Sequence, residues 1–157
     1  MIKQAAAMPP TSKPNIVTIV IPCDPAYVSI ARLAVLGIAN RLDWTTEEVE
    51  DIRLAVAEVC TDAVERAKAH DPATVAGLSI EIIAMIEPDC LTIDIRDHIP
   101  PLPSQPDLHD LKIPGTNLFT DRQEISDALI EALVDTFARS HELGGTVVRL
   151  TKCVTEH

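Results

Sequence analysis

The chain has 157 residues, 46% of them hydrophobic, and a formal net charge of −11 at pH 7. This length provides for one sizeable hydrophobic core, and this hydrophobic content excludes wholesale disorder. The negative charge argues against direct nucleic-acid binding, because phosphate contacts need clustered Lys and Arg. No apolar run approaches the roughly 18 residues of a membrane span, and the first residues lack the apolar centre of a signal peptide. We therefore expect a cytoplasmic protein that does not enter the membrane.

The N-terminal half of the chain contains one predicted strand and two predicted helices. Residues 1–14 are expected to form a disordered arm, and residues 15–21 are rich in β-branched residues that favour a strand. Asp24 provides an N-cap for a helix that reaches about residue 40, because the proline that follows it suits the first helical position. Thr45 and Glu48 form a capping-box pattern that begins the next helix, which we expect to end near residue 70.

The C-terminal half contains four more predicted elements. Alternating apolar residues predict a hairpin of two strands, over residues 78–86 and 91–95. A helix over about residues 121–135 and a last hairpin that turns at residues 143–145 complete a single domain, expected to span residues 15–154. Strands combined with helices that could cover one face predict a two-layer α/β sandwich of the α+β type, with a mixed, mostly antiparallel sheet and its helices on one face.

The four cysteines are scattered along the chain. None belongs to a Cys-x-x-Cys pair, the spacing typical of zinc knuckles and thioredoxin-like motifs. We therefore expect buried free thiols at Cys23, Cys60, Cys90 and Cys153.

Residues 54–67, LAVAEVCTDAVERA, carry the strongest candidate for a functional site. Apolar residues at steps of three and four predict one buried helical face, made of Val49, Ile52, Val56, Val59, Cys60, Ala63 and Ala67. Glu58 and Asp62 lie one turn apart beside that face, where like charges repel each other by roughly 0.2–0.5 kcal/mol. A cation should compensate them. The spacing leaves two possibilities open: Arg66, one turn further on, in an ordinary ion pair, or a bound metal ion.

This segment resembles the N-box helix of the GHKL ATPases, the superfamily that includes DNA gyrase and the histidine kinases. Its sequence is most similar to that of the bacterial anti-sigma factors that are also serine kinases, the RsbW and SpoIIAB type. In these proteins the helix reads roughly LAVSEACTNAVxHA. The similarity also covers residues 19–22, 27–28, 32–33 and 51–54, and more weakly residues 144–148. The resemblance implies the histidine-kinase-like ATPase fold, a homodimer, and two protein partners, a sigma factor and a STAS-type anti-anti-sigma factor.

The resemblance also implies roles for three acidic residues. Glu58 matches the family's catalytic base, which activates the nucleophile that attacks the γ-phosphate of ATP. Asp62 stands where the family has the asparagine that holds Mg²⁺, and a carboxylate binds Mg²⁺ at least as well as an amide does. Asp97 matches the aspartate of the D-x-G box, which accepts a hydrogen bond from the adenine amino group; an ordinary acid that ends a strand before a turn is an equally good interpretation of Asp97.

The glycine boxes of the family are degenerate in this sequence. Ile99 replaces the D-x-G glycine, and a β-branched residue is unsuited to positive φ. The second box aligns with residues 124–127, in a stretch with no glycine between positions 115 and 144. Such glycines let backbone N–H groups approach phosphates at a helix N-terminus. Glu124 and Asp127 are expected to favour their own helix N-terminus instead and to fill a phosphate's position with carboxylates.

Two functions follow from the resemblance. The first is a regulatory protein that sequesters a sigma factor or a similar regulator, is antagonised by a STAS-type partner, binds nucleotide poorly and uses no cofactor. The alternative is an active serine kinase that binds ATP and Mg²⁺ and phosphorylates the STAS-type partner. Glu58 and Asp97 favour the kinase. The lost glycines, the added acids and five prolines from 100 to 114, which stiffen the family's lid segment, favour the regulatory protein.

Overall fold

The computed structural model describes residues 13–101, 118–142 and 144–155. Residues 1–12 of the predicted arm and most of the proline-rich segment lie outside these ranges. The elements in chain order are β1 (Asn15–Pro22), the 3-10 turn η1 (Pro25–Tyr27), α1 (Val28–Ala39), α2 (Thr46–Lys68), α3 (Pro72–Val75), β2 (Ser79–Ile86), β3 (Cys90–Asp97), α4 (Leu118–Leu133), β4 (Thr136–Glu142) and β5 (Gly145–Cys153). None of the helices in the described ranges is long and apolar enough to cross a membrane.

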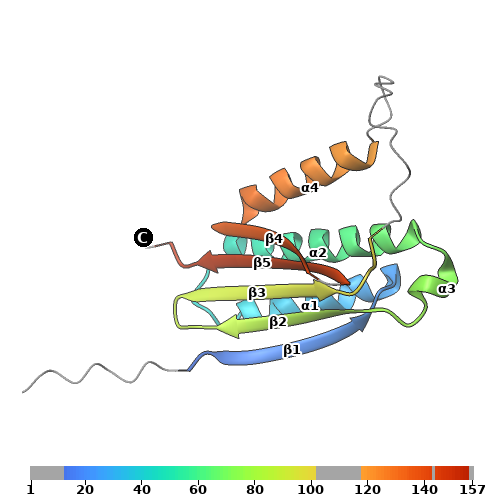
Figure 1. Ribbon diagram of the computed structural model, residues 1–157. Helices are drawn as coiled ribbons and strands as arrows, with labels where there is room; N and C mark the ends of the chain where they lie inside the picture. Colours follow the sequence, from blue (N-terminus) through green and yellow to red (C-terminus); the bar gives the residue numbers. More distant parts are fainter. Residues whose placement is uncertain (1–12, 102–117, 143, 156–157) are drawn as a thin grey trace, which may run out of the picture.

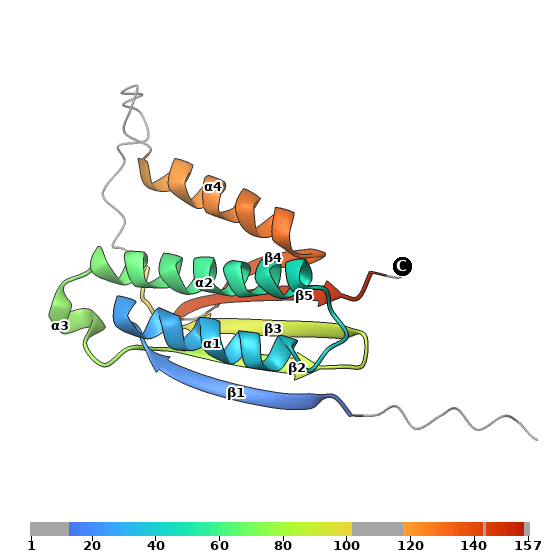
Figure 2. The same cartoon turned by 180° about the vertical axis from the view of Figure 1, so that it is seen from behind.

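A five-stranded sheet and a layer of helices form the two-layer sandwich that the sequence predicts. The strand order is β1-β2-β3-β5-β4. The four pairings between neighbours are all antiparallel, so the described sheet is wholly antiparallel rather than mixed. Helices α1 and α2 cover one face of the sheet, and α4 lies beside α2 above β4 (Figures 1 and 2). β1 forms one edge of the sheet.

The long helix α2 begins at the predicted capping box. The backbone N–H of Glu48 donates to Thr45 Oγ1 at 3.2 Å, and that of Thr45 donates to Glu48 Oε2 at 2.8 Å. Two otherwise unpaired donors are thereby satisfied. The predicted inner face of the helix is confirmed, because its apolar residues are almost completely buried against the sheet; they include Val56, Val59, Ala63 and Ala67. This packing fixes the rotation of α2, and with it the direction of Glu58, Asp62 and Arg66.

The core lies between α1 and α2 and the inner face of the sheet. Alternate residues of the central strands point into it, as the period of a strand requires; they are Ile80, Ile82 and Ala84, then Leu91, Ile93 and Ile95, then Val148 and Leu150. Burying each of the larger side chains contributes about 1.5–3 kcal/mol. The same alternation brings polar residues of β3, β4 and β5 to the edge of this core.

Helix α4 begins at Leu118, three residues before the start that the sequence predicts. Glu124 and Asp127 therefore lie within the helix and not in its first turn. The expectation that they favour the helix N-terminus is wrong, because the helix dipole acts mainly on charges in the first turn.

Cys90 and Cys153 form a disulfide, which corrects the expectation of four free thiols. They are 63 residues apart in the sequence, but the antiparallel register of β3 and β5 places them directly opposite each other, with Cα atoms 4.0 Å apart. Cys23 and Cys60 are free, and of these only Cys60 is fully buried.

Candidate functional site

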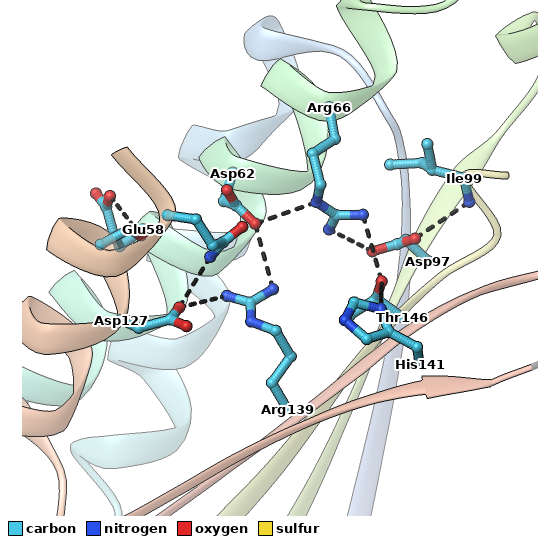
Figure 3. A network of polar contacts seen from close by, with 11 residues as sticks. Glu58, Asp62, Arg66, Asp97, Ile99, Asp127, Arg139, His141 and Thr146 are labelled. Atoms are coloured by element: carbon cyan, nitrogen blue, oxygen red, sulfur yellow. Dashed lines mark hydrogen bonds and ion pairs between the residues drawn. The ribbon is translucent and has the colours of Figure 1, made fainter. Parts of the chain in front are cut away.

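The candidate site is a network of polar and charged side chains from α2, α4 and three strands, β3, β4 and β5 (Figure 3). Arg66 joins two of the predicted acidic residues. Its Nε donates to Asp62 Oδ2 at 3.2 Å, and its Nη2 donates to Asp97 Oδ2 at 2.8 Å. Of the two cations that the helix spacing allows beside Asp62, the structure therefore places Arg66 there. The carboxylates assigned to Mg²⁺ and to adenine are linked through one guanidinium group.

Asp97 ends β3 and is 6% exposed. Its second oxygen, Oδ1, accepts a hydrogen bond from the backbone N–H of Ile99 at 3.1 Å, so both carboxylate oxygens have partners within the chain. Gly145 allows β5 to pass close to this point, because a Cβ there would lie 1.9 Å from the Asp97 carbonyl oxygen. Burial alone would lower the pKa of Arg66, but the hydrogen bond and charge of Asp97, together with Asp62, raise it above its usual value.

A second cation, Arg139 of β4, completes the network and was not singled out from the sequence. Its Nη1 donates to Asp62 Oδ2 at 3.3 Å and its Nη2 to Asp127 Oδ1 at 2.8 Å. The Arg139 side chain is only 11% exposed, and its guanidinium lies over the Phe137 ring, 5.8 Å from the ring centroid. Alternation along β4 puts residue 139 on the inner face of the sheet, a position where a charged residue requires partners.

Glu58 contacts α4. Its Oε1 accepts a hydrogen bond from the hydroxyl of Ser126 at 2.9 Å, and Ser126 is 5% exposed. Asp127, one residue further along, accepts from Gln123 Nε2 at 2.8 Å in addition to Arg139. Glu124 is exposed to solvent. The expectation that Glu124 and Asp127 fill a phosphate's position is therefore not met, since Asp127 is an internal ion-pair partner and Glu124 points to solvent.

A cavity of about 590 Å³ lies beside Arg66, at the Asp97 end of the network. Its lining is formed by Arg66, His70, Ile99, Pro100, Pro101, His141, Glu142, Gly144, Gly145 and Thr146. Thr146 accepts a weak hydrogen bond from Arg66 Nη1 at 3.4 Å and also contacts His141 Nδ1. The cavity is large enough for a small organic ligand. The Asp97 carboxylate beside it, however, already forms an ion pair with Arg66.

Asp62, which the resemblance assigns to Mg²⁺, does not fit that ion as it lies in the structure. Asp62 stands between two guanidinium groups, and the charge of each opposes a divalent cation at the same oxygen. Mg²⁺ also prefers several oxygen ligands in octahedral geometry. Within the described ranges no group of three or more His, Cys, Asp or Glu side chains is arranged to hold a metal ion.

Comparison with known proteins identifies the family. Residues 21–152 match the family model described as the histidine kinase-like ATPase domain. The serine-protein kinase RsbW of Halalkalibacterium halodurans is 32% identical over 148 residues, which cover 89% of this chain and 84% of that protein. The chain belongs to the RsbW family. The RsbW of Listeria monocytogenes serotype 4a is 30% identical over 153 residues, with 89% of this chain and 88% of that protein covered.

A solved structure extends the family assignment to the fold. The crystal structure of the RsbU and RsbW domains of a Mycobacterium tuberculosis protein matches 88% of this chain, with a TM-score of 0.62 and 21% sequence identity. The match covers 32% of that longer chain. The RsbW-family sandwich predicted from the sequence is thus the fold of this chain.

Proposed function

We propose that this RsbW-family protein is an anti-sigma-factor-like regulator. It sequesters a sigma factor or a similar regulator, is antagonised by a STAS-type partner, and binds nucleotide poorly. These partners act in the cytoplasm, where we expect the protein to be found. One observation supports the proposal above the others: each carboxylate that the resemblance assigns to nucleotide chemistry has a partner from the chain itself, at Glu58, Asp62 and Asp97.

The ion pairs oppose nucleotide binding in two ways. A nucleotide that uses Asp97 must first displace Arg66, and separating an ion pair at a buried carboxylate costs about 3–5 kcal/mol when nothing replaces the partner. Since about 1.4 kcal/mol is a tenfold change in affinity, such a cost would weaken binding by roughly a hundredfold or more. A Mg²⁺ ion at Asp62 meets the repulsion of Arg66 and Arg139.

The alternative is an active serine kinase whose target is the STAS-type partner. Two observations favour it. The relatives that align over most of this chain are named serine-protein kinases, and the Glu58 carboxylate is retained on α2. Arg66 could also turn from Asp97 toward a phosphate group, in which case the ion pair would be exchanged rather than lost.

Calorimetric titration with ATP in the presence of Mg²⁺ separates the two functions. We expect the unaltered protein to bind ATP no more tightly than the millimolar range. Asp62→Asn restores the residue type of the family and removes the negative charge between Arg66 and Arg139, so any gain in affinity on this change measures the effect of that charge. Lys68→Ala, in an exposed ion pair on the same helix, serves as the matched control.

A phosphate-transfer assay addresses the kinase directly. The protein is incubated with radiolabelled ATP, Mg²⁺ and a STAS-domain protein from the same organism. Micromolar ATP binding by the unaltered protein would refute the regulatory proposal. Transfer of label that disappears on Glu58→Ala would do so as well and would establish the kinase alternative.

A further inference from the structure

The Cys90–Cys153 disulfide lies at the end of the sheet opposite the charged network. β3 begins at Cys90 and reaches the network at Asp97, its last residue. β5 runs the other way and ends at Cys153. The bridge therefore joins the first residue of one strand to the last residue of its neighbour, where the ladder of backbone hydrogen bonds ends and strands fray most readily.

The short segment after the bridge is attached to the N-terminus of α2. The N–H of Val154 donates to the Asp89 carbonyl at 2.7 Å. Thr155 then donates from its hydroxyl to Glu48 Oε1 at 2.9 Å. Because Glu48 is the capping-box residue of α2, the C-terminal end of β5 and the start of α2 share one carboxylate.

The same strand end is attached to the C-terminus of α4. The Lys152 ammonium donates to the Leu133 carbonyl at 3.0 Å and lies 3.5 Å from Asp51 of α2. The backbone N–H of Cys153 donates to Asp135 Oδ2 at 2.7 Å. Four consecutive residues, 152–155, therefore hold β3, α2 and α4 together at this end of the molecule.

Three of the four cysteines are half-buried, namely the bridged pair and Cys23. Cys23 follows β1 and its backbone N–H donates to the Leu78 carbonyl, at the other end of the sheet from the bridge. Burial and the neighbouring Cys23 raise the pKa of the Cys60 thiol to about 12, and Cys60 is fully buried. A thiol with so high a pKa is a poor nucleophile at neutral pH, since the thiolate is the reactive form. Exchange chemistry at Cys90 and Cys153 therefore does not have to compete with Cys60.

We propose that Cys90 and Cys153 form a reversible thiol–disulfide switch that fastens the end of β5 to the start of α2 and the end of α4. A glutathione thiolate attacks one sulfur, the disulfide bond breaks, and the other cysteine leaves as a thiolate. A second glutathione thiolate attacks the mixed disulfide and releases glutathione disulfide. The two cysteines take up one proton each, so that one protein disulfide and two glutathione thiols give two protein thiols and one glutathione disulfide.

The fold makes the reaction reversible. Eight residue pairs hold β3 against β5, so the ladder keeps the two thiols opposite each other when the bridge is open. Their high effective concentration favours reclosure. Opening the bridge removes the covalent bond between the strands but leaves the sheet intact. Local opening should therefore increase at residues 152–155 and at the helix ends that they contact. This switch goes beyond the proposed function and requires neither partner nor nucleotide.

Hydrogen exchange measured by mass spectrometry on the full chain, equilibrated in oxidising and in reducing glutathione buffers, tests the proposal. We expect reduction to add the mass of two hydrogens and to speed exchange about tenfold or more at residues 46–52 and 130–134, with little change at residues 80–84 in the central strand. The thermal midpoint should fall by on the order of 10 °C. Cys23→Ser, which removes a free thiol, should keep the full redox response.

Three outcomes would overturn the proposal. One is an oxidised protein in which Cys90 and Cys153 are not joined. Another is a bridge that millimolar glutathione cannot reduce at neutral pH. The third is reduction with identical exchange at residues 46–52 and 130–134. Cys90→Ser should reproduce the reduced exchange pattern in oxidising buffer, and reduction of the unaltered protein gives the same information where that variant does not fold.

Discussion

At the scale of single residues, the central feature is Asp62, on which two guanidinium groups converge. Arg66 approaches from the same helix and Arg139 from a strand 77 residues away in the sequence. Asp62 and Arg139 have side chains that are 13% and 11% exposed. Pairs this far from solvent are screened less than surface pairs, and removing one partner leaves a charge that water hydrates poorly.

Replacing Arg139 with Met should destabilise the protein by about 2–3 kcal/mol, because Asp62 loses one of its two cations and Asp127 its only arginine in the described structure. Urea denaturation at neutral pH measures the change. Lys68→Met is the matched control, since the exposed Lys68–Glu65 pair should contribute less than about 1 kcal/mol. Equal losses in the two variants would show that the Arg139 contacts add no stability.

Only some contacts of the candidate site could be predicted from the sequence. The spacing of Glu58, Asp62 and Arg66 on one helix is a local property, and helix geometry made the pairing of Asp62 with Arg66 one of two predicted possibilities. Arg139 and the Cys90–Cys153 bridge are brought into place by strand pairing, which depends on the whole topology. Neither carries a local signal, so a single sequence could not reveal them.

At the scale of the elements, α2 was the most predictable part of the chain. Its capping box and its apolar period identified its start and its buried face, because both depend on residues within a few turns. The start of α4 was less predictable. The sequence has Asn117 directly before Leu118, but no Glu or Gln three residues later to complete a capping box, and the predicted start fell at residue 121. The alternation of apolar and polar residues in the strands predicted the fold class. That every strand pairing is antiparallel was seen only in the structure.

The cap of α2 should make stability depend on pH. Hydrogen bonds from the backbone of Thr45, and from Thr155, lower the pKa of Glu48 from 4.5 to about 2, although burial opposes the shift. The folded state thus binds this proton more weakly than the unfolded state. The stabilisation by the Glu48 carboxylate is complete above the unfolded pKa of 4.5 and is lost as the pH falls toward 2.

Glu48→Gln keeps a side chain that can complete a capping box but removes the charge. We expect the difference in unfolding free energy between the unaltered protein and this variant to be constant above about pH 5.5 and to shrink steadily toward pH 2. Urea denaturation across this pH range measures it. Glu47→Gln removes a charge from the same helical turn and controls for the general effect of charge at this helix end. A difference that stays the same at pH 3 would contradict the assignment to Glu48.

At the scale of the whole molecule, the sheet formed by the described residues has an edge, β1, that carries no protecting charges. β1 reads NIVTIVIP and contains no charged residue, although charges on edge strands commonly block pairing between molecules. Its outer-face residues Ile16 and Val20 are 61% and 60% exposed. β1 pairs with β2 on one side, and its other side offers backbone groups to a second strand. These features, together with the resemblance, favour a homodimer, the commonest symmetric assembly.

We expect the protein to be a homodimer at micromolar concentration, joined through β1 of each copy in a two-fold arrangement. Light scattering coupled to size-exclusion chromatography should give twice the mass of the chain, 17.1 kDa. Val20→Lys places a charge on the exposed edge strand and should yield monomers without loss of the folded circular-dichroism spectrum. Ile125→Lys makes the same change at a position on α4 that is 71% exposed, and it should leave the dimer intact. A monomeric mass for the unaltered protein at micromolar concentration would refute the homodimer. A dimer that survives Val20→Lys but dissociates with Ile125→Lys would show that the interface lies on the helical face and not at the sheet edge.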